Sequence, residues 1–214
     1  IPALRATLRV RPHSVQSLAG WRALVALPEA HAHRSAADIL ALIAASALGE
    51  RAQALAAETF RLLARIEGGI HGIAPDQVEF HEIGALDSIL DVCVAAALIE
   101  RLAPAAIHCS PLPVCDGVVH CAHGPLATPA PAVQEMLRGV PVYGIESRGE
   151  TITPTALAVL KAAGTVFGAW PAMIVEEVAR AYGGRVLPGI PNGAVFAIGR
   201  RTAAPAATFS PLLP

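Results

Sequence analysis

The stretch Val78–Leu102, VEFHEIGALDSILDVCVAAALIERL, constrains the fold of this chain more than any other segment. Its first residues alternate as a short strand does, and its second half is an apolar run typical of a packed helix. We therefore expect a strand over 78–81 and a helix over 88–102, with Ser88 or Asp87 as the N-cap. Side chains at such a strand-to-helix edge are held by rigid elements yet reach solvent, which favours a functional site there.

Four polar side chains gather around this edge: His81, Glu82, Asp87 and Asp91. Imidazole and carboxylate groups serve as metal ligands and as general acids or bases. A structural interpretation stays open beside the functional one. Asp87 could only cap the helix, Asp91 could only favour the positive helix N-terminus, and His81 could be a hydrogen-bonded histidine at the core boundary.

The order of the remaining segments predicts an α/β fold. Strands are expected over 5–11, 106–109, 140–145, 173–178 and 194–198, and helices over 38–48, 50–66, 130–137 and 154–163. The second of these helices is expected to end at Gly68-Gly69, and the last to be capped by Thr153 with Pro154 in its first turn. The strands at 78–81 and 106–109 flank a helix, which predicts a parallel βαβ unit in a mixed sheet with helices packed on it. Residues 1–201 are interpreted as one domain, and 202–214 as a proline-rich tail or linker.

Composition narrows the class of protein. The chain has 214 residues, of which 54% are hydrophobic and 15% charged, so it can bury a sizeable core. The net charge is −1, and no basic stripe or polybasic run along the sequence indicates a nucleic-acid or membrane partner. No signal peptide pattern is present, and irregularly spaced cysteines in a chain of this size indicate reduced thiols and a cytoplasmic location. Because the sequence begins at Ile1 without Met, further residues are expected upstream.

A second cluster of possible metal ligands lies in the segment 108–123, HCSPLPVCDGVVHCAH. Thiolates and imidazoles bind zinc, copper and nickel. The cysteines are spaced more widely than in a zinc knuckle, so local packing of Cys115 and Cys121 is the main interpretation and a metal site the alternative. His123 is the better candidate ligand in this segment.

Three further residues are candidates for binding an anion. Arg34 could pair with a phosphate or carboxylate through both of its terminal nitrogens, or could simply be solvated at a helix start. Thr153 and Thr155 could present hydroxyl and amide groups to a phosphate at a helix N-terminus, although plain helix capping is the other interpretation.

The string FHEIGALDSILD closely resembles the corresponding phrase of the LarC family, the nickel insertion proteins of nickel-pincer cofactor biosynthesis. The resemblance extends in the family order from about His31 to about Arg200, through the segments HAHRS, IHG, CSPLP, AHGPL, TPAPA, GVPVY and ETITPT. The family's acidic, glycine-containing first string and its C-terminal part, associated with CTP use, are not found. The resemblance is therefore to the N-terminal portion of such a protein.

The resemblance implies a nickel chelatase, or cyclometallase, of the lyase class that inserts Ni²⁺ into pyridinium-3,5-bisthiocarboxylic acid mononucleotide and consumes CTP through its C-terminal part. Our hypothesis, which goes beyond the resemblance, is that His81 and Glu82 with Asp87 or Asp91 present the ion and that His123 assists. His81 or Glu82 would remove the ring proton when the nickel–carbon bond forms. Arg34, Thr153 and Thr155 then bind the substrate's phosphate or carboxylate. A non-catalytic nickel- or substrate-binding module and a divergent inactive member remain alternatives, and a homo-oligomer is left open.

Overall fold

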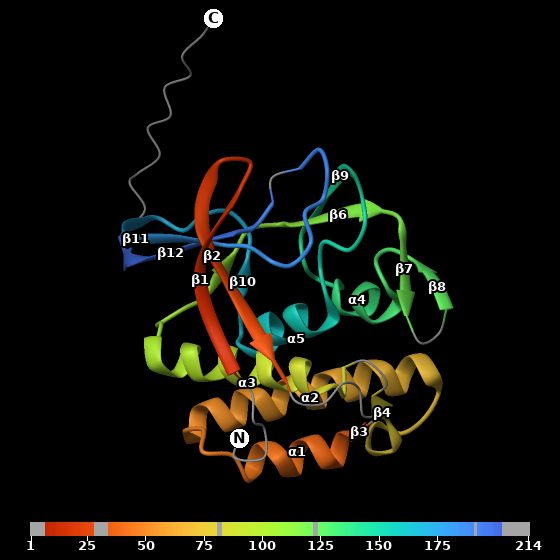
Figure 1. Cartoon of the computed structure of the whole chain (residues 1–214). Coiled ribbons are helices and arrows are strands. Elements are labelled where there is room, and N and C mark those ends of the chain that lie inside the picture. The colour runs from red at the N-terminus through yellow and green to blue at the C-terminus, as the bar shows by residue number, and fades with distance from the viewer. Residues whose placement is uncertain (1–6, 28–33, 81–82, 122–123, 191, 203–214) are drawn as a thin grey trace, which may run out of the picture.

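The computed structural model describes residues 7–27, 34–80, 83–121, 124–190 and 192–202 (Figure 1). Five α-helices occur in these ranges: α1 (Ala36–Ala44), α2 (Glu50–His71), α3 (Leu86–Leu102), α4 (Pro131–Met136) and α5 (Pro154–Ala162). A 3₁₀ turn, η1 (Pro75–Gln77), follows α2. The strands are β1 (Thr7–Val15), β2 (Leu18–Ala26), β3 (Arg34–Ser35), β4 (Glu79–Phe80), β5 (His108–Cys109), β6 (Leu112–Asp116), β7 (Val118–Cys121), β8 (Gly124–Ala127), β9 (Val142–Arg148), β10 (Val166–Phe167), β11 (Met173–Ala181) and β12 (Ala194–Arg201).

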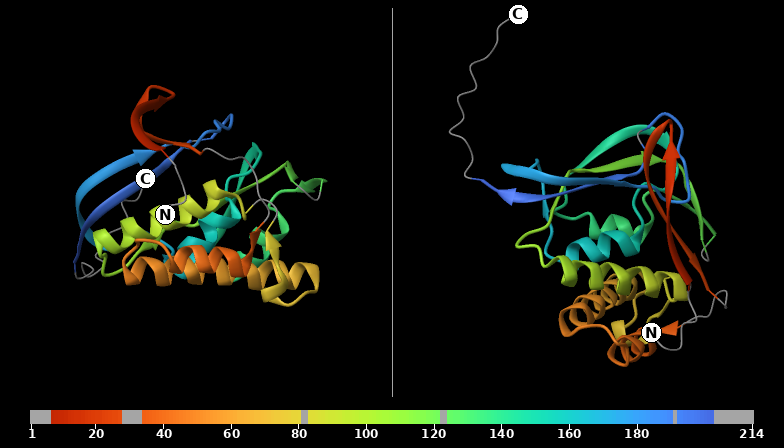
Figure 2. Two further views of the ribbon diagram at one scale, coloured as in Figure 1. Left: turned by 60° about the horizontal axis from the view of Figure 1, so that its bottom comes forward. Right: turned by 60° about the vertical axis from the view of Figure 1, so that its left-hand side comes forward.

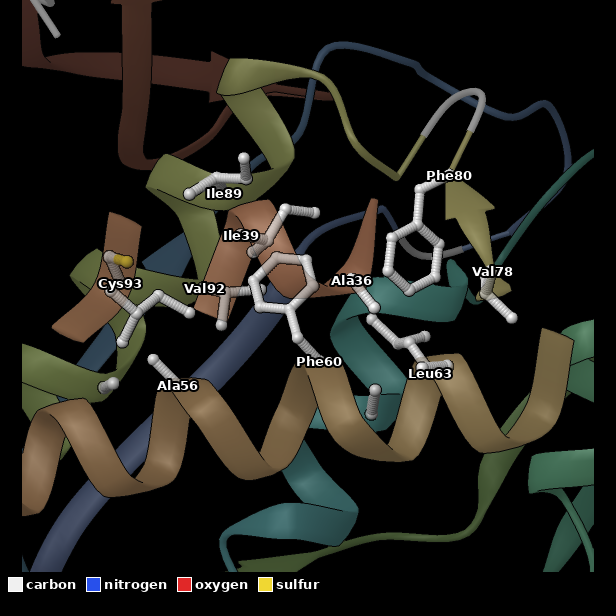
Figure 3. Close-up of a cluster of buried hydrophobic side chains, with 14 of the residues drawn as sticks. Ala36, Ile39, Ala56, Phe60, Leu63, Val78, Phe80, Ile89, Val92 and Cys93 are labelled. Carbon is white, nitrogen blue, oxygen red and sulfur yellow. The ribbon is translucent and has the colours of Figure 1, made fainter. Parts of the chain in front are cut away.

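The helices build the hydrophobic core around α2, which packs against all four other α-helices. Phe60 and Leu63 of α2 are fully buried. Figure 3 shows Phe60 beside Ile39 of α1 and Val92 of α3, and Leu63 beside Ala36 at the start of α1. Burying an aromatic or branched side chain of this kind contributes about 1.5–3 kcal/mol, so these contacts stabilise the packing of the helices against one another. Among the described residues, the buried core cluster contains none from the four-stranded sheet.

The largest sheet lies on the other side of the molecule and has the strand order β1-β2-β11-β12. Its outer pairs are antiparallel hairpins, and β2 and β11 run parallel where the two hairpins cross (Figures 1 and 2). Two further parallel pairs, β5 with β10 and β6 with β9, form separate ribbons. In the sequence, helices lie between β5 and β10 and between β6 and β9. The predicted α/β class with parallel strands is therefore confirmed.

The parallel pair is not where the sequence placed it. β4 pairs antiparallel with β3, and β5 pairs with β10, so the strands on either side of α3 are not neighbours. One edge of β4 faces the chain leading into α1, where Ala36 N donates to Val78 O at 3.1 Å. The hydrogen bonds of β5 go to β10 instead, where Val166 N donates to Ile107 O and Gly168 N donates to Cys109 O, both at 2.9 Å.

Several helix ends also differ from the prediction. The helix expected over 50–66 continues through Gly68-Gly69 to His71 and ends at Gly72, whose φ of 67° is the left-handed conformation that glycine adopts easily. The N-cap of α3 is Ala85, neither Ser88 nor Asp87. By contrast, α5 begins as predicted, with Thr153 as N-cap and Pro154 in the first turn. Within the described ranges, no helix combines the length and the apolar character needed to cross a bilayer.

Candidate functional site

The strands β3 and β4 form a short antiparallel pair at the start of α1, which we call the β3–β4 edge. Arg34 lies opposite Phe80, and Ser35 lies opposite Glu79. Ser35 also caps α1, because its hydroxyl accepts from Asp38 N at 3.1 Å while Asp38 accepts from Ser35 in return. Phe80 is buried and meets the ring of Phe60 edge to face, with centroids 6.2 Å apart. The β3–β4 edge is therefore anchored to the core by Phe80 and to α1 by Ser35.

The turn that follows β4 is closed by Gly84. The guanidinium of Arg34 donates from Nη1 to Gly84 O at 3.0 Å. A Cβ on Gly84 would lie 2.5 Å from Phe80 O and 3.1 Å from Arg34 N, so the backbone approaches here more closely than any other residue allows. His81 and Glu82, the predicted ligand and base, lie outside the described residues. His123 lies outside the described residues as well.

Two carboxylates follow the turn on α3, at the second residue of the helix and one turn later. Asp87 accepts a hydrogen bond from Ser88 N at 2.8 Å. Asp91 retains access to solvent, but partial burial raises the pKa of its carboxyl above the ordinary value, and the like charge of Asp87 raises it further. The opposite side of α3 carries Ile89 and Val92 into the core. Two like charges one turn apart repel each other, and a bound cation would remove that cost.

Arg34 thus has a positioning contact that the sequence did not predict, in addition to its charge. Its hydrogen bond to Gly84 ties β3 to the turn before α3, across fifty positions of the sequence. The structure therefore brings Arg34 close to the segment that leads into Asp87.

Thr153 and Thr155 lie elsewhere, at the start of α5. Thr153 Oγ1 accepts from Ala156 N at 3.3 Å and lies 3.4 Å from Thr155 Oγ1. Helix capping, the second interpretation of these residues, is therefore one established role of Thr153. Since α5 packs against both α2 and α3, it belongs to the same helical layer as the carboxylates.

The cysteines of the segment 108–123 favour the packing interpretation where they are described. Cys115 is buried, and its thiol donates to Gly149 O at 3.0 Å. Burial raises the pKa of the Cys109 thiol, which disfavours the thiolate that a metal would need. In the described part of the chain, no three His, Cys, Asp or Glu side chains are close enough together to hold a metal ion.

Comparison with known proteins decides the family. The model of the nickel insertion protein family matches residues 2–208. The chain belongs to the nickel insertion protein family. A relative from Geobacter metallireducens, named "Putative nickel insertion protein", is 42% identical over 192 residues, which are 90% of this chain and 49% of that protein.

Two other family members are similarly close. A Nocardioides protein named "Pyridinium-3,5-bisthiocarboxylic acid mononucleotide nickel insertion protein" is 42% identical, over 87% of this chain and 47% of its own length. A protein from Syntrophotalea carbinolica is 44% identical, over 83% of this chain and 45% of its own length. The chain therefore spans about half the length of the family members it matches. No solved structure matches this chain.

Proposed function

We propose that this chain takes part in inserting Ni²⁺ into pyridinium-3,5-bisthiocarboxylic acid mononucleotide, the substrate in the name of the Nocardioides relative. The observation that supports this role most directly is the match of the nickel insertion protein family over residues 2–208. In the structure, Arg34 donates to Gly84 O two residues before α3, which links β3 to the segment that carries Asp87 and Asp91. A support of this kind helps to hold the metal-binding side chains in place for an incoming ion. Family membership supports nickel as the ion handled.

The roles we assign follow the chemistry of the reaction. His81, Asp87 and Asp91 hold the incoming nickel with His123, through oxygen and nitrogen ligands that the substrate's sulfur atoms can displace. His81 or Glu82 accepts the ring proton that leaves when the nickel–carbon bond forms. Arg34 and the hydroxyls of Thr153 and Thr155 contact the anionic groups of the substrate.

A raised pKa at Asp91 has a direct consequence for metal binding. Nickel and a proton compete for the same carboxylate, so affinity should fall as the pH is lowered through the raised pKa of Asp91. The imidazole of His81 would add a second loss of affinity when it becomes protonated.

The test is a calorimetric titration of the purified chain with NiCl₂. The parent chain is compared with His81→Ala/Asp87→Ala and with a control, His71→Ala/Asp76→Ala, that also removes one imidazole and one carboxylate. Binding that is lost in the first variant and kept in the control supports the site. Binding that persists in the first variant, or that is absent from the parent chain, refutes it, and absence would favour a divergent inactive member.

A second candidate function is a nickel- or substrate-binding module without chemistry of its own. It is favoured by the length comparison, since the family members are about twice as long as the part matched here. On this candidate, CTP use and the lyase-class step belong to a C-terminal part. Mixing the chain with the C-terminal part of a full-length relative, nickel, CTP and the mononucleotide distinguishes the two. At saturating nickel, His81→Ala/Glu82→Gln should lower the rate of product formation on the first candidate and leave that rate unchanged on the second.

A further inference from the structure

The hairpin β1–β2 sorts its side chains onto two chemically different faces. Arg11 lies directly opposite Arg22 in the antiparallel register, so both project from the same face of the sheet. Arg9 and His13 stand two positions to either side of Arg11 and share that face. The other face carries apolar side chains, among them Leu8, Val10 and Trp21, each exposed by at least 45%.

The crossing strand β11 adds a fourth arginine to the same face. Ala181 is the partner of Trp21, so Arg180, one residue earlier, lies on the face of Arg22. The ring of Tyr182 confirms this assignment, because it meets His13 edge to face with centroids 5.8 Å apart. We call Arg9, Arg11, Arg22 and Arg180 the arginine face.

The arginine face is electrostatically unfavourable as it stands. Like charges placed directly opposite each other destabilise a strand pair, and Arg11 and Arg22 are such a pair. In the ranges that the structure describes, none of the four guanidinium groups forms an ion pair or a side-chain hydrogen bond. No described Asp or Glu of β1 or β2 lies on this face to offset them.

A hollow adjoins the arginine face at Arg180. It has a volume of about 440 Å³ and is lined by Val15, Leu18 and Val195, which share the face, and by Gly189, Ile190, Asn192 and Gly193. The side chain of Asn192 accepts from Leu187 N and donates to Leu187 O, both at 2.8 Å, which ties this side of the hollow to the end of the preceding segment. Small-molecule sites have volumes of about 300–1,000 Å³ and combine apolar walls with a few charged groups.

We propose that the arginine face binds the phosphate of a phosphomonoester and that the hollow receives its organic part. A guanidinium offers two parallel N–H donors that match a pair of phosphate oxygens, and a dianion offsets the repulsion between Arg11 and Arg22. The site is separate from the β3–β4 edge and follows from the sheet alone. The mononucleotide in the name of the Nocardioides relative is itself a phosphomonoester, so the choice of a mononucleotide as the ligand rests on the proposed function.

The experiment uses nicotinamide mononucleotide as the phosphomonoester, with nicotinamide riboside and inorganic phosphate as comparisons. We expect the mononucleotide to bind, the riboside not to bind, and inorganic phosphate to bind more weakly than the mononucleotide. Arg11→Gln/Arg22→Gln should weaken mononucleotide binding about tenfold or more, as expected for the loss of charge-assisted hydrogen bonds. The control Arg51→Gln/Arg101→Gln removes the same charge from exposed helix positions and should leave the affinity unchanged.

Three results would overturn the proposal: no binding by the parent chain, equal loss in the variant and the control, or equal binding of the riboside and the mononucleotide. Phosphate binding as tight as that of the mononucleotide would overturn the role of the hollow. Misfolding is checked independently, because removing the Arg11–Arg22 repulsion should leave the melting temperature the same or higher. Nickel binding by the variant should equal that of the parent, which separates this site from the proposed nickel site.

Discussion

Replacing Gly84 with alanine tests whether the turn beside the β3–β4 edge is as rigid as its contacts indicate. The added Cβ would lie 2.5 Å from Phe80 O, well inside any permitted contact, and 3.1 Å from Arg34 N. Both neighbours are backbone atoms, and Phe80 is anchored in the core, so neither can move without disturbing the packing. Overpacking of this kind costs about 1–3 kcal/mol. In a chain of this size each kcal/mol corresponds to about 2–4 °C, so the melting temperature should fall by about 2–12 °C.

The matched control is Gly69→Ala, the same chemical change within α2. A Cβ on Gly69 meets no atom within 4 Å, and the position is helical. Alanine there should raise the stability by about 0.5–1 kcal/mol, because the unfolded chain loses freedom. The assay is thermal unfolding followed by circular dichroism, with the nickel titration repeated on both proteins. If Gly84→Ala melts within 1 °C of the parent, the turn adapts easily and the argument for a preorganised site fails.

Three further substitutions have expected outcomes of defined sign. Asp91→Asn removes a carboxylate charge that is partly buried and lies one turn from the like charge of Asp87, and it should stabilise the chain at pH 7 by about 0.2–0.5 kcal/mol. Because the pKa of Asp91 is raised in the folded state, the free energy of unfolding of the parent should fall by this amount as the pH rises through that pKa. Urea titrations of the variant across the same pH range should not show this fall. Phe60→Ala, at a fully buried position, should cost about 3–5 kcal/mol in urea unfolding. Ser35→Ala removes the cap of α1 and should cost about 0.5–2 kcal/mol in the same assay, whereas no loss would mean that the capping box is not formed in solution.

The sequence predicted correctly those elements whose ends are marked by a capping residue, a proline or an apolar run. The cap at Thr153 and the proline after it placed α5 correctly, and the apolar run after Ser88 placed α3 to within two residues at its start. Gly68-Gly69 misled the prediction, because a glycine can serve close packing as well as termination. A Cβ on Gly68 would lie 2.8 Å from Ile73 O, so this glycine lets the chain fold back against α2.

The hairpin β1–β2 shows why other elements were missed. Its two-residue turn consists of Gln16 and Ser17, both at positive φ, in place of the Asn-Gly or Asp-Gly that announces such a turn in a sequence. The pairing of β2 with β11 joins segments about 160 positions apart, which no local pattern reveals. Arg9, Arg11 and Arg22 share a face because of the β1–β2 register, and Arg180 joins them only through that distant pairing. A linear search therefore finds Arg9 and Arg11 on one strand face but not the whole cluster.

The candidate site could be predicted only in part for a similar reason. The residue types and their order indicated a site near α3, but the hydrogen bond from Arg34 to Gly84 depends on the pairing of β3 with β4. The pKa shift of Asp91 likewise depends on what surrounds α3 in three dimensions. Sequence supplied the donors and acceptors, and tertiary contacts decided which of them meet.

The separation of the helical core from the four-stranded sheet leads to a last prediction, on hydrogen exchange. The amides of α2 and α3 belong to elements whose side chains form the buried core, so they should exchange only on global unfolding. The residues of β1 and β2 have mostly exposed side chains, with Trp21 exposed by 49%. Their amides should therefore exchange by local opening at a lower free energy. Exchange measured by mass spectrometry on peptides from 7–26 and 50–71 gives the comparison. Equal protection of the two segments would mean that the sheet unfolds together with the helices, and substitutions on the arginine face could then no longer be interpreted apart from folding.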